Sequence, residues 1–162
     1  MDLNINIQPM TRSESAEAVN LVALSMNTDE ALWAEKTFQF YFQCRENEIH
    51  PARTYFSAYC GDVLCGLVGL HVYRWGPVEN AWLSWFAVHP DYQNKGVGSK
   101  LIAEIEKQAT ALGYRKLFIE TYNGAEFEKA RNFYSKMGYS ASGEIEDYLP
   151  DNTAMVVFKK NL

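Results

Sequence analysis

The sequence predicts an α+β fold built on one mixed, mostly antiparallel sheet, and three features of the chain carry that prediction. Alternating apolar and polar residues open the chain, three apolar segments separated by turns fill residues 54–88, and strand and helix patterns alternate after Val88. We expect about seven strands flanked by about four helices, with one strand-helix-strand crossover in the middle. A chain of 162 residues that is 48% hydrophobic suits one compact core, so we expect a single domain over residues 1–162.

The first half of the chain supplies a strand, two helices and a three-stranded meander. "NINIQPM" alternates like a short strand, and apolar residues recur at helical spacing over Ser13–Met26, where Ser13 is the expected N-cap. A second, aromatic-rich helix is expected from Asp29, its cap, to about Cys44. The segments "TYFSAYC", "VLCGLVGLHVYRW" and "NAWLSWFAV" predict three antiparallel strands joined by turns at residues 61–62 and 76–77.

The second half alternates helix and strand and then closes with a strand pair. Apolar residues from Leu101 to Leu112 predict a helix that Gly113 ends, and "KLFIET" follows as a strand. "NGAEFEKARNFYSKMG" predicts another helix, with Asn123 and Glu126 in capping-box positions and Gly138 as its end. "YSASGEIEDYL" and "NTAMVVFKK" are expected to pair as the last two strands.

Composition and charge exclude several classes of protein. A net charge of -5 and a pI near 5.2 disfavour nucleic acid and anionic membranes as partners, and no apolar run is long enough to span a bilayer. Without a signal-peptide pattern at the start, we expect a cytoplasmic protein. Cys60 and Cys65 are expected to stay reduced, because a two-residue hairpin turn would make them distant diagonal neighbours. No His or Cys cluster has metal-ligand spacing, so we expect no metal.

Two glycines and several polar residues join the meander to the next helix, in "VHPDYQNKGVGSKLIAEIE". We call Gln93–Gly98 the glycine turn. The first amides of a helix lack intrahelical partners and the helix dipole adds positive charge, so an anion is favoured there, and glycines let a phosphate approach the main chain of Lys95–Lys100. The spacing fits neither a P-loop nor a dinucleotide fingerprint, whose third glycine is replaced by Leu101. A tight turn without a ligand is the alternative interpretation.

Two motifs resemble those of the GNAT superfamily of N-acetyltransferases. "WLSWFAVHPDYQNKGVGSKLI" contains Q-x-x-G-x-G at Gln93, Gly96 and Gly98, like the acyl-CoA-binding motif of that family. "ARNFYSKMGY", residues 130–139, is similar to the motif that follows it, and the order of elements also agrees over nearly the entire chain. The resemblance implies an enzyme that transfers an acetyl group from acetyl-CoA to an amine by direct attack in a ternary complex. It also implies a bulged strand before the glycine turn, splayed from the next strand.

The resemblance further implies how acetyl-CoA is held. Main-chain groups of Phe86 and Val88 would pair with the pantetheine amides, and an amide near Phe86 or Ala87 would stabilise charge on the reacting carbonyl oxygen. The expected acetyl-CoA contacts are Phe86, Ala87, Val88, Gln93, Asn94, Lys95, Gly96, Val97, Gly98, Ser99, Lys100, Asn132 and Phe133. Tyr134 matches the family tyrosine that protonates the departing thiolate, although its spacing also fits a core aromatic.

The residue that removes a proton from the acceptor ammonium is less defined. Trp82 stands where histone-type members of the family place a glutamate. Glu120, at a strand end, is the expected base, with Glu79, Ser84 or a water chain as alternatives. A solvated surface carboxylate is the competing interpretation of Glu120.

The family's acceptor site implies a set of aromatic and acidic contacts, which suit a cationic amine with an apolar or planar body. The expected acceptor contacts are Trp33, Tyr41, Tyr73, Glu79, Trp82 and Tyr148. The acceptor itself stays open between a small-molecule amine, an amino acid derivative and a protein amino group, either a lysine or the amino terminus. A non-catalytic acyl-CoA-sensing or protein-interaction domain is the alternative function, and exposed aromatics with an open last strand favour a homodimer.

Overall fold

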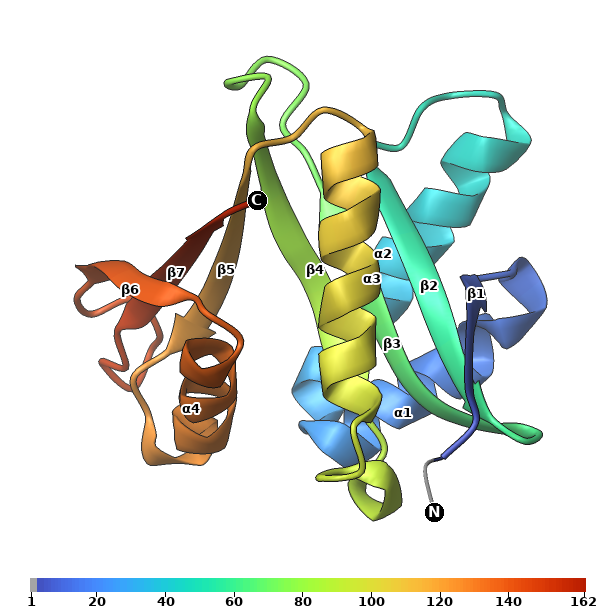
Figure 1. The fold of residues 1–162 in the computed structure, drawn as a ribbon, viewed down its shortest axis with the longest axis horizontal. Coiled ribbons are helices and arrows are strands. Elements are labelled where there is room, and N and C mark those ends of the chain that lie inside the picture. Colours follow the sequence, from blue (N-terminus) through green and yellow to red (C-terminus); the bar gives the residue numbers. More distant parts are fainter. Residues whose placement is uncertain (1–2) are drawn as a thin grey trace. The chain divides into compact units, whose positions relative to one another are not determined.

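The computed structural model describes residues 3–162 and has the predicted α+β architecture. Its seven-stranded sheet has the order β1-β2-β3-β4-β5-β7-β6, with four α-helices in the described part of the chain (Figure 1). The strands are β1 (Ile5–Pro9), β2 (Arg53–Cys60), β3 (Val63–His71), β4 (Asn80–Val88), β5 (Lys116–Tyr122), β6 (Ser140–Ile145) and β7 (Met155–Asn161). The helices are α1 (Ser15–Ser25), α2 (Thr28–Glu46), α3 (Val97–Ala111) and α4 (Glu128–Lys136).

The chain folds into two compact units. One comprises the chain up to His71 together with Ser84–Ile105, and the other comprises Val72–Leu83 and Glu106–Leu162. The single domain expected over residues 1–162 stays a prediction.

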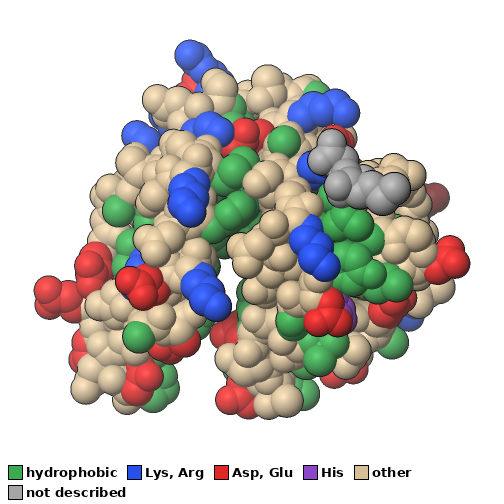
Figure 2. All heavy atoms as spheres, turned by 60° about the horizontal axis from the view of Figure 1, so that its bottom comes forward, with side chains coloured by type: hydrophobic (Ala, Val, Ile, Leu, Met, Phe, Trp, Pro, Cys, Tyr) green, Lys and Arg blue, Asp and Glu red, His purple; other side chains and the backbone are tan. Residues whose placement is uncertain are grey.

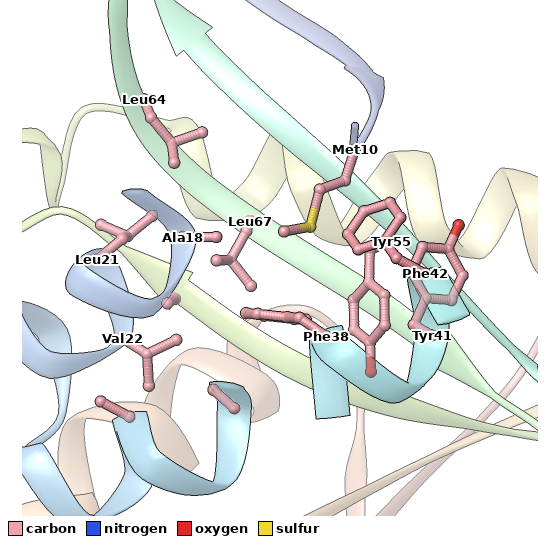
Figure 3. Packing of buried hydrophobic residues seen from close by; sticks show 13 residues of the cluster. Met10, Ala18, Leu21, Val22, Phe38, Tyr41, Phe42, Tyr55, Leu64 and Leu67 are labelled. Carbon is pink, nitrogen blue, oxygen red and sulfur yellow. The ribbon is translucent and has the colours of Figure 1, made fainter. Parts of the chain in front are cut away.

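The first unit is built on the antiparallel strands β1, β2 and β3, as the sequence predicts. Helices α1 and α2 cover one face of these strands, and Leu21, Phe38 and Leu67 are almost fully buried between them (Figure 3). Burying each such side chain contributes about 1.5–3 kcal/mol to folding. The first turns of α3 lie on the other face (Figure 1). There the fully buried Leu101 packs close to Gly66 of β3. Both faces of β3 are therefore covered, which fits its almost continuous apolar sequence.

Aromatic rings fix α2 against β2. The ring of Tyr55 lies 5.0 Å from those of Phe38 and Tyr41, edge-on in both cases (Figure 3). Such edge-to-face pairs contribute about 0.5–1.5 kcal/mol beyond the apolar area that they bury. The aromatic content of α2, only loosely periodic in the sequence, is thus explained by this contact with the sheet.

The second unit holds the rest of the sheet. β5, β7 and β6 are antiparallel neighbours, and Asn80–Trp82 of β4 pairs in parallel with Lys116–Phe118 of β5. Within this unit, Glu106 accepts from the Tyr139 hydroxyl and from Lys160 Nζ, each at 2.8 Å. The parallel pair with its intervening helix confirms the predicted crossover.

Two helix caps differ from the expected ones. Thr11, rather than Ser13, begins the first helical turn: its hydroxyl donates to the Glu14 carboxylate at 2.7 Å, and its amide donates to the same oxygen. Asn27, rather than Asp29, caps α2 by accepting from the Glu30 amide at 2.8 Å. In each case a residue two positions earlier has the extended backbone that an N-cap needs.

The expected capping box of α4 does not form between Asn123 and Glu126. A 3-10 turn, Ala125–Phe127, precedes the helix, and the Asn123 side chain is used elsewhere. Its Oδ1 accepts from the Ala154 amide at 3.0 Å and its Nδ2 donates to Glu144 at 3.1 Å. Asn123 therefore ties the end of β5 to the last strand pair. Gly113 and Gly138 do follow the ends of α3 and α4, both at positive φ, as predicted.

The prediction that Cys60 and Cys65 lie far apart, as diagonal neighbours of a hairpin, is wrong. A bulge shifts the β2–β3 register, so that Ala58 pairs with Gly66 while Tyr59 pairs with Leu64, and Cys65 is the extra residue. The two sulphurs lie 2.7 Å apart, although both thiols are free. Burial and the neighbouring thiol raise the pKa of Cys65 to about 12, so this thiol stays protonated at neutral pH.

Candidate active site

The glycine turn has the geometry of an anion site. Gly96 has a φ of +85°, and a Cβ built at this position would meet no atom within 4 Å. The Lys100 amide makes the first helical bond, to the Gly96 carbonyl at 3.1 Å, so the amides of Val97, Gly98 and Ser99 precede it. No acidic side chain occupies the first turn of the described α3. Open space therefore faces a positively polarised helix end.

Side-chain contacts hold the segment before α3 in place. Gln93 Nε2 donates to the Val88 carbonyl at 3.2 Å, which ties the glycine turn to the end of β4. Asn94 has a left-handed φ of 59°, and Lys95 Nζ lies 5.6 Å from the centre of the Tyr92 ring. Gln93 is thus a support of the turn, in addition to the ligand contact expected from the motif.

β4 bulges just before the glycine turn. Trp85 has a φ of 25°, in the left-handed region that a bulky residue seldom adopts. Ala81, Ser84 and Ala87 are buried at intervals of three, where a regular strand would bury every second residue. Among the described residues, β4 and β5 pair only through the three residues that begin each strand. The bulge is what the resemblance implies.

A polar network that sequence reasoning did not find lies beside this bulge. The Tyr55 hydroxyl and Ser84 Oγ are 2.9 Å apart, and Arg53 Nη1 donates to Ser84 Oγ at 3.4 Å. Burial raises the pKa of Tyr55, so its hydroxyl keeps its proton at neutral pH. Alternation along β2 indicates that Arg53 and Tyr55 share a side, but no local signal pairs them with Ser84.

Tyr134, the expected acid, is 6% exposed in the second unit. Its ring lies 6.0 Å from Phe158 of β7 and 6.3 Å from Tyr139. Burial raises the pKa of the Tyr134 phenol above its ordinary value, so the group is protonated at neutral pH. Asn132 is exposed and Phe133 is half-buried on the same helix. Both the packing role and a proton-donor role are compatible with this environment.

An aromatic row surrounds Glu120 in the second unit. Phe118, Glu120 and Tyr122 alternate along one side of β5. Trp82 stacks on Phe118 with ring centres 4.8 Å apart, and Tyr148 lies 6.2 Å from Tyr122. Partial burial raises the pKa of Glu120 above its ordinary value, although the residue is exposed overall. We call these five residues the β5 row; Phe118 and Tyr122 are members that sequence reasoning did not include.

The other expected acceptor contacts have varied surroundings. Tyr41 is 1% exposed and belongs to the core of the first unit, which explains its place in the aromatic contacts of α2. Trp33 is exposed and lies under Lys36 Nζ, 4.7 Å from its ring centre. Tyr73 contacts Trp82, and Glu79 pairs with both Arg115 and Lys116. Of the expected acceptor contacts, Trp82 and Tyr148 therefore belong to the β5 row and Tyr73 lies at its edge. Tyr41 is instead a packing residue.

Charged side chains of both signs occur on the face drawn in Figure 2, separated by uncharged surface. Among residues 3–162, no group of three or more His, Cys, Asp or Glu side chains is placed to hold a metal ion. A search of the same residues finds no helix with the length and apolar character of a membrane span.

The sequence matches the model of the acetyltransferase (GNAT) family over residues 18–139, a range that includes the glycine turn and Tyr134. The chain belongs to this family. It is 30% identical over 112 residues to the uncharacterized N-acetyltransferase YsnE of Bacillus subtilis, and the match covers 68% of this chain and 71% of that protein. As a GNAT member, the protein is an acetyl-CoA-dependent N-acetyltransferase.

Solved GNAT structures have the same fold. A family member from Desulfovibrio desulfuricans superposes with a TM-score of 0.87 at 19% identity, over 97% of this chain and 98% of its own. A GNAT acetyltransferase from Elizabethkingia anophelis, solved with acetyl-CoA bound, gives 0.75 at 20% identity over 98% and 99% of the two chains. Both likenesses concern the fold and confirm the predicted GNAT architecture.

Proposed function

We propose that this GNAT acetyltransferase binds acetyl-CoA at the glycine turn and transfers the acetyl group directly to an amine in a ternary complex. The observation that carries the proposal is the open space at Gly96 beside the first amides of α3. A diphosphate fits such a site because main-chain donors and the helix dipole both favour negative charge. The Elizabethkingia structure, which holds acetyl-CoA on the same fold, supports acetyl-CoA as the co-substrate.

The pantetheine arm is assigned to the bulged part of β4. An extended amide chain adds to a sheet where a strand offers main-chain groups that its neighbour does not use. Phe86 and Val88 are the proposed partners, since β5 pairs with β4 only at Asn80–Trp82 among the described residues. An amide at Phe86 or Ala87 then stabilises the negative charge that develops on the acetyl carbonyl oxygen.

The acetyl transfer requires protons to leave the acceptor nitrogen and a proton to reach the departing sulphur. An acceptor bound as an ammonium first loses one proton to become the neutral amine. The amine nitrogen then bonds to the acetyl carbon, the carbon–sulphur bond breaks, and the sulphur takes a proton while the nitrogen loses its second. We assign the proton donor to Tyr134, whose raised pKa keeps its phenol protonated until the thiolate departs. We propose Glu120 as the base that removes a proton from the acceptor nitrogen, because the raised pKa of this carboxyl lies closer to the pH at which the enzyme works.

The acceptor is proposed to lie against the β5 row. Aromatic faces attract an ammonium group, and a carboxylate among them adds a direct counter-charge. The proposed acceptor contacts are Trp82, Phe118, Glu120, Tyr122 and Tyr148, with Tyr73 at the edge of the row. Trp33 and Glu79 are kept as further proposed contacts on the family resemblance alone. We further propose a cytoplasmic enzyme, in keeping with its three free thiols, and a homodimer.

Calorimetry and a thiol-release assay test the proposal together. We expect acetyl-CoA to bind the purified protein, and free thiol to appear when a panel of small amines and peptide amino termini is added. No heat from acetyl-CoA would disprove the assignment of the glycine turn. Binding without thiol release for any amine would instead identify a non-catalytic acyl-CoA-binding protein.

A further inference from the structure

An arginine without a carboxylate partner lies beside the bulge of β4. Arg53 begins β2, is half-buried, and donates through Nη1 to Ser84 Oγ at 3.4 Å. Within residues 3–162 its guanidinium has no carboxylate at ion-pair distance, whereas Arg12 pairs with Glu46 and Arg115 with Glu79. A guanidinium has five N–H donors in a planar fork, so the long bond to Ser84 and the interaction with the Tyr55 hydroxyl leave part of its capacity unused.

The surroundings of Arg53 contribute no compensating negative charge. His71 is its direct partner in the β2–β3 register, and burial together with the charge of Arg53 lowers the pKa of His71 to about 4. His71 is therefore neutral at pH 7. The Tyr55 hydroxyl also keeps its proton, because burial raises its pKa. Arg53 is thus a single positive charge among neutral hydrogen-bonding groups.

A half-buried cation with few protein acceptors around it is favoured by an anion that supplies charge-assisted hydrogen bonds. Carboxylates match the guanidinium fork in a bidentate pair, which is the strongest arrangement open to an arginine. The hydroxyls of Tyr55 and Ser84 hold the site in place on two different strands, β2 and β4. The network therefore offers a fixed carboxylate subsite.

The position of this subsite connects it to the reaction. Ser84 precedes by two residues Phe86, where the proposed function locates the acetyl group, and two residues of a strand span about 7 Å. The bulge at Trp85 interrupts the alternation of side chains along β4, so the neighbouring residues Ser84 and Trp85 both contact the side of the sheet on which Tyr55 lies. A short acceptor can then have its amine at the acetyl carbon and its carboxylate at Arg53.

We propose that Arg53 binds a carboxylate of the acceptor, so that the substrate of this enzyme is an amino acid or a similar small amine that carries a carboxylate. The inference deepens the proposed function and rests on it, since it uses the location assigned to the acetyl group. Arg53 acts in binding, and Ser84 and Tyr55 position its guanidinium.

The test compares each of the twenty common amino acids with its carboxamide, in the thiol-release assay at saturating acetyl-CoA. We expect the free carboxylate to be preferred at least tenfold in kcat/KM for the best substrates. Arg53→Gln is expected to raise KM for the carboxylate about 10- to 100-fold, the range of a lost charged hydrogen-bond pair, while changing KM for the carboxamide less than threefold. Arg53→Lys keeps the charge but not the planar fork, so its KM for the carboxylate substrate is expected to lie between those of the wild type and Arg53→Gln.

Arg12→Gln is the matched control, because it removes the same charge from an exposed ion pair in the same unit. It should leave the preference unchanged, and thermal unfolding of all variants checks that they fold. Carboxamides that react as well as carboxylates, or a preference that survives Arg53→Gln, would overturn this inference and leave the proposed function standing. Thiol release with none of the forty compounds, nor with any other amine, would overturn both.

Discussion

The ring of Tyr55 lies directly over the main chain of Gly69, its partner in the β2–β3 register. A Cβ built on Gly69 would meet a ring carbon of Tyr55 at 2.4 Å, closer than two carbons can approach without displacement. The missing side chain lets the phenol cross β3 and reach Ser84 on β4 at 2.9 Å. Gly69 therefore connects the core under α2 with the polar network at the bulge.

Gly69→Ala is expected to lower the free energy of unfolding by about 1–3 kcal/mol, because the Tyr55 ring is packed against Phe38 and Tyr41 and cannot move away without strain. Denaturant titration measures the change. Gly143→Ala is the control, since a Cβ there meets nothing within 4 Å. Equal stability of the two variants would contradict the packing described for Tyr55.

This contact also marks the limit of what the sequence can predict. Periodicity in the chain gives every helix and strand, and the glycine turn with the Tyr134 motif gives the family, because these signals lie within one or two adjacent elements. The Arg53, Tyr55 and Ser84 network joins strands that are about thirty residues apart, and only the register and the bulge bring them together. The same bulge-dependent register explains the wrong distance expected between Cys60 and Cys65.

The predicted helix caps were wrong for a more local reason. Ser, Thr, Asn and Asp are nearly equivalent as caps, so a sequence rich in them does not say which residue is used. Thr11 and Ser13 compete at the first helix, and Asn27 and Asp29 at the second. The structure selects the earlier residue in both cases because its backbone is extended.

Gly96→Val is expected to weaken acetyl-CoA binding at least tenfold in calorimetry, because the side chain would occupy the space assigned to the diphosphate and the positive φ would be strained. Gly113→Val is a matched control: Gly113 has nearly the same φ, +89°, and equally open surroundings, but lies at the other end of α3. Both variants should lose similar stability. Similar affinity for acetyl-CoA in the two would show that the diphosphate binds elsewhere.

Tyr134→Phe is expected to lower kcat by about 100-fold, as for loss of a general acid, with the Kd for acetyl-CoA changed less than threefold. The thiol-release assay measures kcat, and calorimetry measures the Kd for acetyl-CoA. Tyr139→Phe serves as the comparison, because it removes a buried hydroxyl that bonds Glu106 at 2.8 Å in the same unit. That variant should lose about 1 kcal/mol of stability and keep its kcat. An unchanged kcat in Tyr134→Phe would leave Tyr134 as a core aromatic.

Glu120→Gln is expected to lower kcat/KM for the amine by at least tenfold near neutral pH, and to remove the decline in activity at acid pH that protonation of Glu120 causes. The raised pKa of Glu120 sets that decline at a higher pH than an ordinary glutamate would. A pH profile of kcat/KM checks both effects. Glu146→Gln, an exposed carboxylate on the loop after β6, should keep the wild-type profile. If the decline of kcat/KM at acid pH is unchanged in Glu120→Gln, another group removes the proton from the acceptor.

Glu14 makes the stability of the protein depend on pH. Burial raises the pKa of its carboxyl, but hydrogen bonds from the Tyr59 hydroxyl, at 2.6 Å, and from Thr11 outweigh burial and lower it overall. A carboxylate whose pKa is lower in the folded state adds stability above its unfolded pKa, near 4.5, and loses it as the pH falls through the folded value.

Glu14→Gln is therefore expected to cost about 1–3 kcal/mol at pH 7, since it leaves weaker partners for Tyr59 and Thr11, and progressively less below pH of about 4. Urea denaturation of wild type and variant between pH 3 and pH 8 measures this difference. Glu17→Gln, one turn along α1 and exposed, removes the same charge and should show a small difference at every pH. A Glu14→Gln penalty that stays constant down to pH 3 would mean that packing of the side chain, and not its ionised form, stabilises the start of α1.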